Sequence, residues 1–311
     1  MSEQHVIFGT GPIGLAVAEA LIKRSKAVRM VNRSGKAAIQ GVQVIAGDAT
    51  DPTFTREAAK GATVVYNCTN PPYNQWPELF PKLQAGVVAG AQAANAKLVA
   101  MDNLYMYGSP QGKPMTEMTP SNAHTRKGKV RAQMAQDLLA AHQRGDIRVT
   151  IGRASDYFGP RAMDSALGDR VMYPVLQGKA AQILGDADAP HTYSYIPDIG
   201  EGLVILGERE EALGQVWHLP NAPTLTTRQV LEMVFAEAGH PPKISSAPRL
   251  GVRFIGLFNP VVREVYEMLY EFEEPFIVDH SKFERAFGNC ATPLPEAVKA
   301  TVAWFRANPK H

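Results

Sequence analysis

The chain of 311 residues has little cysteine, no excess of either charge and no long apolar run. Its two cysteines, Cys68 and Cys290, lie far apart, which argues against a disulfide framework and fits a reducing cytoplasm. Lys and Arg number 32 against 30 acidic residues, so the net charge of +2 does not suit a general nucleic-acid binder. No apolar run approaches the roughly 20 residues that cross a membrane, and the first residues lack the pattern of a secretory signal. We therefore expect a cytoplasmic protein that binds neither nucleic acid nor membrane.

Hydrophobic residues make up 45% of the chain and charged residues 20%, a composition typical of a folded globular protein. In the first half, short apolar runs alternate with amphipathic stretches. This alternation predicts a parallel sheet covered by helices on both faces. The predicted strands are 5–8, 28–31, 42–45, 63–66, 97–101 and 147–151, and the helices between them include 13–24, 76–95 and 126–144.

After residue 155 Gly and Pro become frequent and the alternation loosens. We predict a strand at 215–219 and helices at 227–238 and 295–307, with a range at 250–272 that Pro260 divides into two helices. The expected fold is therefore a doubly wound α/β domain over 1–155 and a smaller C-terminal α/β lobe over 156–311. Some later segments are expected to return to the first domain.

The strongest motif is G-x-G-x-x-G, directly after the first predicted strand and at the start of the first helix. In it, Gly9 permits a tight turn, Gly11 lets the backbone approach a pyrophosphate and Gly14 lets helix and strand pack closely. The start of the helix offers free N–H groups and the positive end of the helix dipole to phosphates. The whole turn is therefore predicted to bind a dinucleotide: Gly9, Thr10, Gly11, Pro12, Ile13 and Gly14.

The end of the second predicted strand bears on the choice of cofactor. An acidic residue there would bind the ribose 2′-hydroxyl of NAD, but the sequence has Asn32-Arg33-Ser34. Arg33 can pair with a 2′-phosphate, and Asn32 and Ser34 can donate hydrogen bonds to it. The sequence therefore favours NADP over NAD, although a solvated surface arginine remains an alternative.

Two further strand ends carry small or polar residues. After the third strand, Asp48 could accept a hydrogen bond from an adenine amino group beside Ala49, or could be a turn or helix-cap residue. After the fourth strand, Cys68, Thr69 and Asn70 lie at the carboxyl edge of the sheet, where ligands of such sheets bind, and suit a ribose and diphosphate wall. Cys68 is expected to be a small buried residue and not a nucleophile.

Together these elements resemble the extended short-chain dehydrogenase/reductase family, the NAD(P)-dependent epimerase/dehydratase group. The resemblance covers most of the chain. It rests on these segments: 9–14, Gly47-Asp48, 64–70, Tyr105-Met106-Tyr107-Gly108, 116–120, 153–160 and 191–198. It implies a Rossmann-type fold and oxidoreductase or epimerase chemistry, with a nucleotide sugar as the commonest substrate class.

The family's chemistry rests on a serine and on a Tyr-x-x-x-Lys pair whose tyrosine is the acid/base, and this sequence departs from both. Asn103 stands in the serine slot, Lys127 in the tyrosine slot and Arg131 in the lysine slot. Because Lys127 and Arg131 lie on one helical face, they could contact the cofactor ribose or an anionic substrate, or could belong to a solvated basic face. Tyr105 is a further candidate proton donor, whereas Tyr107 is expected to be a packed core residue.

The loop after the fourth strand contributes a candidate pocket. Tyr73 and Trp76 could line it, or could belong to a rigid helix start, and His191 is a further possible polar group there. The histidines show no metal-ligand spacing, so no metal is expected. Apolar residues also recur at helical spacing near the C-terminus: Phe254, Leu257, Phe258, Val262, Tyr266 and Leu269. We interpret this stripe as core or as the roof of the pocket, with a homodimer face as the alternative.

Three functions fit these patterns. The first is an NADP-dependent oxidoreductase or epimerase-like enzyme that acts on a small carbonyl, hydroxyl or sugar-like substrate with unusual acid/base residues. The second is a catalytically silent sensor or regulator that binds NADP. The third is an interaction protein with a vestigial site, which the intact glycine motif disfavours.

Overall fold

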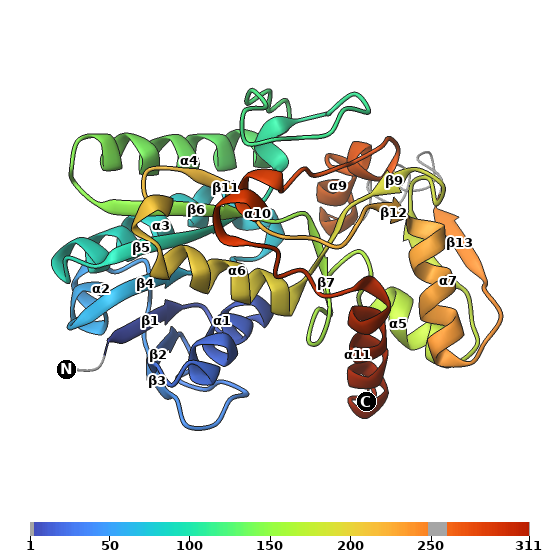
Figure 1. Ribbon diagram of the computed structural model, residues 1–311, viewed down its shortest axis with the longest axis horizontal. Helices are drawn as coiled ribbons and strands as arrows, with labels where there is room; N and C mark the ends of the chain where they lie inside the picture. Colours follow the sequence, from blue (N-terminus) through green and yellow to red (C-terminus); the bar gives the residue numbers. More distant parts are fainter. Residues whose placement is uncertain (1–2, 248–259, 311) are drawn as a thin grey trace.

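A computed structural model describes residues 3–247 and 260–310, and the fold is given for those residues. Within them one parallel sheet of seven strands carries helices on both faces, and a smaller group of helices and short strands lies beside it (Figure 1). The strand order is β11-β6-β5-β4-β1-β2-β3. Because the order reverses between β1 and β4, ligands of such a sheet bind at the carboxyl ends of these strands. The order confirms the doubly wound α/β fold expected from the sequence.

The strands of this sheet are buried on both faces. In β1, Val6 and Phe8 pack into the core on one side, and Ile7 packs into the core on the other. This explains why the sequence shows continuous apolar runs instead of alternation. The strands are β1 (Gln4–Phe8), β2 (Ala27–Asn32), β3 (Gln43–Ala46), β4 (Ala62–Asn67), β5 (Lys97–Asp102), β6 (Arg148–Arg153) and β11 (Val216–His218).

Helices α1 (Pro12–Lys23) and α6 (Ile196–Glu208) cover one face of the sheet. They cross closely, because a Cβ at Gly200 would lie 2.6 Å from the backbone of Ala16. The other face is covered by α2 (Pro52–Ala58), α3 (Trp76–Ala93) and α4 (Arg126–Gln143). The sequence did not predict α6, because three glycines lower its helical propensity and most of its residues are buried, which removes the polar face that marks a surface helix.

The C-terminal half builds a second core between α5, α7 and α11, and β8 and β10. Its short strands pair as β10 with β7, β12 with β9 and β13 with β8. From this half α6 and β11 return to the large sheet, where β11 pairs with β6. The elements are β7 (Asp156–Phe158), α5 (Asp169–Leu176), β8 (Ala181–Leu184), β9 (Pro190–His191), β10 (Tyr193–Tyr195), η3 (Glu210–Ala212), β12 (Leu225–Thr226), α7 (Thr227–Ala238), β13 (Ile244–Ala247), α10 (Ser281–Phe287) and α11 (Leu294–Ala307).

The apolar stripe predicted over 250–272 falls partly outside the described residues, with Phe254, Leu257 and Phe258 among those not described. Its described part forms α9 (Pro260–Tyr266) and the single turn η4 (Leu269–Phe272). Leu269 is fully buried, as a core residue should be. Two other short turns, η1 (Tyr73–Gln75) and η2 (Tyr105–Tyr107), follow β4 and β5 and carry aromatic residues toward the C-terminal half.

Candidate functional site

The glycine turn between β1 and α1 has two glycines that packing requires. Gly9 has a φ of +107°, and a Cβ on it would lie 2.3 Å from the carbonyl oxygen of Cys68. A Cβ on Gly14 would lie 2.1 Å from the carbonyl oxygen of Gly9. Both positions therefore exclude any side chain, as the motif predicts. Ile13, on the first turn of α1, packs against the core between this helix and the sheet.

Gly11 differs from its two neighbours because nothing in the protein requires it to be glycine. Its φ is −71°, which any residue adopts, and no atom of the described protein lies within 4 Å of the position of a Cβ. It caps α1 without a side-chain hydrogen bond, Pro12 follows it, and no acidic residue lies in the first turn. The backbone at the start of α1 is thus left uncovered by side chains of the described residues, and helix starts of this kind can bind anionic groups.

The loop after β2 is shaped by Asn32. Its Oδ1 accepts hydrogen bonds from the backbone N–H of Ser34 at 3.1 Å and of Gly35 at 2.7 Å. Its Nδ2 donates to Thr10 Oγ1 and to the carbonyl of Lys36, each at 2.6 Å. The amide hydrogens of Asn32 are therefore used inside the protein, so Asn32 ties this loop to the glycine turn.

Arg33, next in the chain, is exposed beside the same turn. Its charge is one cause of the lowered pKa of Asp48, after the hydrogen bonds that Thr50 donates to that carboxylate. The backbone N–H of Thr50 donates to Asp48 Oδ1 at 2.8 Å, so Asp48 forms the predicted turn, and its contact with adenine stays a prediction. Ala49 follows, half-buried against the core under α2 and α3.

At the end of β4, Cys68 is buried and burial raises the pKa of its thiol to about 12. Cys68 is thus the small buried residue that was expected. Thr69 donates from its hydroxyl to Asn67 Oδ1 at 2.7 Å, and Asn70 is exposed beside it. These residues lie next to the glycine turn, because Cys68 N donates to the carbonyl of Phe8 in β1.

The structure corrects one alternative for Lys127 and Arg131, that of a solvated basic face. Their side chains are 1% and 7% exposed. Lys127 Nζ forms ion pairs with Glu264 and, at 3.0 Å, with Glu267, both from the C-terminal half. Arg131 pairs with Asp102. The sequence analysis missed these partners because each cation is paired with a carboxylate from a distant segment of the chain.

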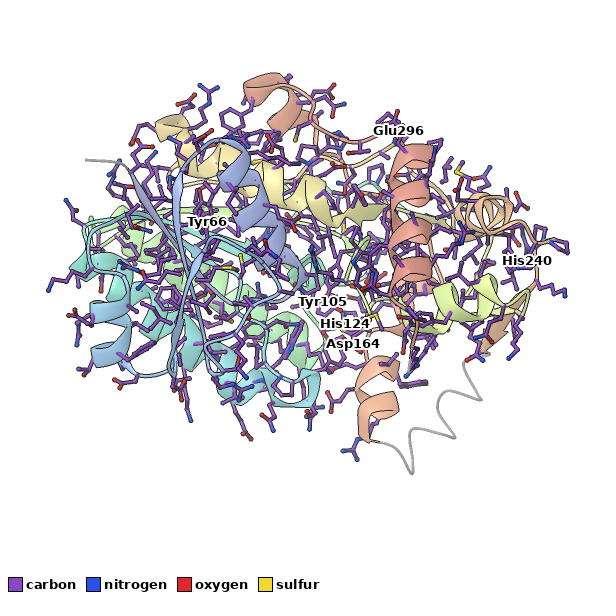
Figure 2. The ribbon with its side chains drawn as sticks, turned by 90° about the horizontal axis from the view of Figure 1, so that it is seen from below. Tyr66, Tyr105, His124, Asp164, His240 and Glu296 are labelled. Atoms are coloured by element: carbon purple, nitrogen blue, oxygen red, sulfur yellow. The ribbon has the colours of Figure 1, made fainter. Side chains whose placement is uncertain are left out.

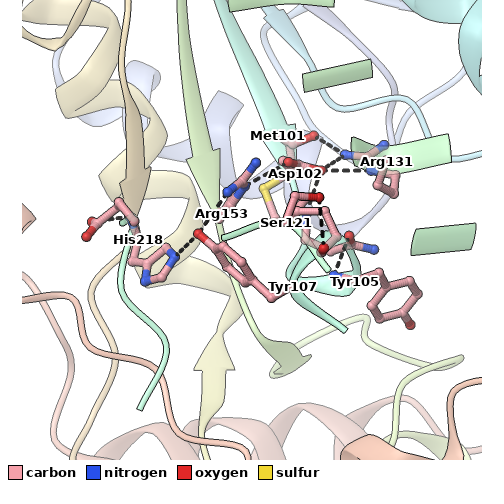
Figure 3. Close-up of polar contacts among 11 residues, drawn as sticks. Met101, Asp102, Tyr105, Tyr107, Ser121, Arg131, Arg153 and His218 are labelled. Carbon is pink, nitrogen blue, oxygen red and sulfur yellow. Dashed lines mark hydrogen bonds and ion pairs between the residues drawn. The ribbon is translucent and has the colours of Figure 1, made fainter. Parts of the chain in front are cut away.

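Asp102, the last residue of β5, joins Arg131 and Arg153 in a buried network (Figure 3). The Arg131 Nε donates to Oδ1 at 2.8 Å and the Arg153 Nε donates to Oδ2 at 3.0 Å. Arg153 also donates to the Tyr107 hydroxyl at 2.8 Å, which lies 2.8 Å from Nε2 of His218. Tyr107 is thus the packed residue that was predicted.

Asn103, in the serine slot, begins the loop after this strand. Its backbone N–H donates to Asp102 Oδ1 at 2.9 Å, and its Oδ1 accepts from the backbone N–H of Tyr105 at 3.2 Å. The side chain therefore orients Tyr105, and no described residue accepts a hydrogen bond from its Nδ2.

Aromatic side chains wall the site between β4 and β5. Tyr105 stacks on Trp76 with ring centroids 5.6 Å apart, and its hydroxyl lies 3.3 Å from that of Tyr73. Lys127 Nζ lies 4.4 Å from the centre of the Tyr73 ring. In Figure 2 Tyr105 lies near the middle of the molecule, between the large sheet and the C-terminal helices. Tyr73, Trp76 and Tyr105 are thus brought together at the carboxyl edge of the sheet.

His191, predicted as a pocket residue, lies in a buried acidic group that sequence reasoning missed. Its Nε2 is 2.9 Å from Asp156 Oδ2, and its Nδ1 is 3.1 Å from the carbonyl of Glu271. The side chain of Glu271 is buried, and burial and the charge of Asp156 raise its pKa well above the usual value. Asp156 stands in the segment 153–160 that carried the family resemblance, so that segment was the available signal.

No group of three or more His, Cys, Asp or Glu side chains among the described residues is arranged to hold a metal ion. In the same part of the chain, every helix is too short or too polar to cross a membrane.

Comparison with known proteins places this geometry in a family. The chain is 22% identical over 211 residues to a dTDP-glucose 4,6-dehydratase of Streptomyces griseus, a match that covers 68% of this chain and 58% of the relative. The chain thus matches less than two thirds of that relative. The crystal structure of gox2253 superposes with a TM-score of 0.81 at 18% identity, over 99% of both chains. A Thermus thermophilus UDP-glucose 4-epimerase, in complex with NAD, gives 0.78 at 18% identity over 98% of this chain and 100% of that one.

These structures share the fold. The model of the NAD dependent epimerase/dehydratase family matches residues 6–219, which include the glycine turn, Asp102, α4 and His191. This range covers more than half of the chain, and the chain belongs to the NAD dependent epimerase/dehydratase family.

Proposed function

We propose that this protein is an NADP-dependent oxidoreductase or epimerase-like enzyme that acts on a small carbonyl, hydroxyl or sugar-like substrate. The observation that carries the proposal is Gly11, whose missing side chain leaves a cradle over the uncapped start of α1. Family membership supports enzymatic chemistry of the epimerase/dehydratase type. The names of the relatives, dTDP-glucose 4,6-dehydratase and UDP-glucose 4-epimerase, support a sugar-like substrate.

The proposed preference for NADP rests on Arg33. It is exposed beside the glycine turn, and no described residue forms an ion pair with it. A 2′-phosphate beside Arg33 would receive a charge-assisted hydrogen bond, and Ser34 can add a second donor. NAD lacks that phosphate and would gain nothing from Arg33.

The chain's own residues would divide the work between holding the cofactor and handling protons. The glycine turn, Thr69 and Asn70 would bind the dinucleotide, which supplies or accepts a hydride when bound. Asn103 would donate from its amide nitrogen to the ligand, and Tyr73, Trp76 and Tyr105 would exclude water from the reacting atoms. Lys127 and Arg131, held by carboxylates, would set the position of α4 against the substrate.

Calorimetric titration with NADPH and with NADH, side by side, tests the proposal. Tighter binding of NADPH is expected, and Arg33→Ala should remove most of the difference between the two cofactors. Arg170→Ala, an exposed arginine on α5, is the matched control and should leave both affinities unchanged. Binding of neither cofactor would contradict the proposed function.

A second function, an NADP-binding sensor without turnover, is supported by a specific observation. Lys127 and Arg131 occupy the slots of the family's tyrosine and lysine, and both are engaged by protein carboxylates. A sensor should bind NADPH but leave it unoxidised when glyceraldehyde and methylglyoxal are supplied. Oxidation of NADPH with any of these probes would favour the enzyme.

A homodimer is proposed from the surface of α3 and α4. An apolar groove of about 460 Å³ runs between these helices and is lined by Pro81, Val88, Val130 and Ala141, among others. A second copy could bury these side chains by the hydrophobic effect. Analytical ultracentrifugation tests this, and Val88→Glu with Val130→Glu should shift a dimer to monomers.

A further inference from the structure

The buried group around His191 contains one more proton than a neutral histidine supplies. His191 Nδ1 faces the backbone carbonyl of Glu271 at 3.1 Å, and a carbonyl only accepts hydrogen bonds. A neutral ring that donates from Nδ1 has no proton on Nε2. Yet Nε2 lies 2.9 Å from Asp156 Oδ2, and an ionised carboxylate is also only an acceptor. The contact therefore requires a second proton, shared between His191 and Asp156.

The ring of His191 is fixed in this orientation. It stacks between Phe272 and Phe276, with centroids at 5.2 Å and 5.3 Å, and its side chain is 2% exposed. Rotating the ring by about 180° would put carbon atoms where Nδ1 and Nε2 now make their contacts. The side chain of Asp156 is 19% exposed, so its carboxylate can be reached from outside the group while His191 cannot.

Several tyrosines and a glutamate are close enough to Asp156 for its charge to act on them. The negative charge of Asp156 is one of the causes that raise the pKa of five tyrosines around it. These tyrosines are Tyr73, Tyr105, Tyr157, Tyr193 and Tyr270. Glu271 faces Asp156 as well, and its Oε1 is buried without a hydrogen-bond partner among the described residues. The ring of His191 is the group of the described structure that contacts the Asp156 carboxylate at ion-pair distance.

This group lies where a substrate of the fold would react. Asp156 begins β7 just after β6, Tyr105 follows β5 and Tyr73 follows β4, and these three strands are neighbours in the sheet. The glycine turn follows β1, the next strand along the same edge. The carboxyl ends of parallel strands meet at one edge of the sheet. Asp156 and Gly11 therefore lie at the same edge.

We propose that Asp156 is the acid/base residue of this protein and that His191 is its positioning residue, in place of the tyrosine missing from α4. This rests on the proposed function. In the reducing direction a carbonyl carbon gains the hydride, and the C=O π pair moves to oxygen. That oxygen takes the shared proton through the Asp156 carboxyl. Neutral His191 and ionised Asp156 remain, and a proton from water restores the pair. In the oxidising direction each step reverses.

A spectroscopic experiment tests the shared proton without any cofactor or substrate. In protein labelled with ¹⁵N-histidine at pH 7, His191 should carry protons on both ring nitrogens. In Asp156→Asn, the new amide can donate to Nε2, so only Nδ1 should remain protonated. Asp164→Asn, at an exposed acid beyond β7, should leave the His191 signals unchanged. A singly protonated His191 in the wild type would overturn the proposal.

Turnover tests the catalytic part, with NADPH and the probes glyceraldehyde and methylglyoxal. Asp156→Asn should lower kcat by at least about 100-fold, the usual contribution of a general acid or base, with the affinity for NADPH unchanged. His191→Gln should lower kcat less and alter its dependence on pH. Unchanged kcat in Asp156→Asn, or a wild type that binds NADPH and reduces none of the probes, would overturn the catalytic role. A wild type that fails to bind NADPH would instead contradict the proposed function and leave the NMR result valid.

Discussion

Lys127, on the first turn of α4, forms a buried ion pair with Glu264 of α9, a residue 137 positions later in the chain. A second carboxylate, Glu267, lies 3.0 Å from the same Nζ. The Lys127 side chain is 1% exposed and that of Glu264 is 8% exposed, so the pair is shielded from solvent. The contact joins α4, which covers the large sheet, to α9 of the C-terminal half.

We predict that Lys127→Ala lowers the free energy of unfolding by about 3 kcal/mol, because it leaves Glu264 buried without its main partner. Urea denaturation followed by circular dichroism measures this loss. Adding Glu264→Ala should recover part of it, since the buried carboxylate, left with Arg126 as its ion-pair partner, is then gone. Lys129→Ala, at an exposed neighbour on the same helix, should keep the wild-type midpoint. A wild-type midpoint in Lys127→Ala would show that the pair contributes no net stability.

Much of the fold was predictable because its signals are local. The apolar run of β1, the glycine turn and the start of α1 follow one another within a short stretch, and each has a sequence pattern of its own. The carboxylate partners of Lys127 and Arg131 have no such pattern. Glu264 lies in α9 and Asp102 ends β5, so only the tertiary fold brings these carboxylates to Lys127 and Arg131.

The same reason explains the incomplete prediction of the site. His191 was singled out, but its partners Asp156 and Glu271 are brought to it by β7 and η4, neither of which shows a periodic pattern long enough to predict. Strands β7, β9, β10 and β12 have two or three residues each, which is too short for an alternating pattern to be recognised.

Gly11→Ala should weaken NADPH binding by at least about tenfold and leave the fold intact, because its Cβ would enter the open space that the pyrophosphate is proposed to occupy. Calorimetry measures the affinity and a thermal melt measures the fold. Gly14→Ala is the contrasting variant: its Cβ would lie 2.1 Å from a backbone oxygen, so it should lower the melting temperature in the absence of cofactor. Full affinity in Gly11→Ala would mean that the cradle does not hold the cofactor.

Asp102→Asn should destabilise the protein by about 3 to 5 kcal/mol, because it leaves two buried guanidinium groups, Arg131 and Arg153, without their shared carboxylate. Urea denaturation measures the change. Asp137→Asn, at an exposed position on α4, is the matched control and should be close to wild type. Equal stability of the two variants would show that other groups satisfy both arginines.

The pH dependence of stability should carry a contribution from His5. Burial lowers the pKa of His5 to about 4, from an ordinary value of 6.5, so the unfolded chain binds a proton here that the folded chain does not between pH 6.5 and pH 4. Stability therefore falls as the pH falls through this window. The shift corresponds to about 3 kcal/mol at pH 4.

His5→Phe should remove this contribution, because the ring keeps its stacking on Tyr66 but no longer titrates. Urea denaturation of both proteins at pH 7, 6, 5 and 4 gives the difference in unfolding free energy at each pH. That difference should shift in favour of the variant by about 3 kcal/mol between pH 7 and pH 4. His240→Phe, at a half-exposed position after α7, should run parallel to the wild type. Parallel curves for His5→Phe and the wild type would mean that His5 is protonated equally in the folded and unfolded chains.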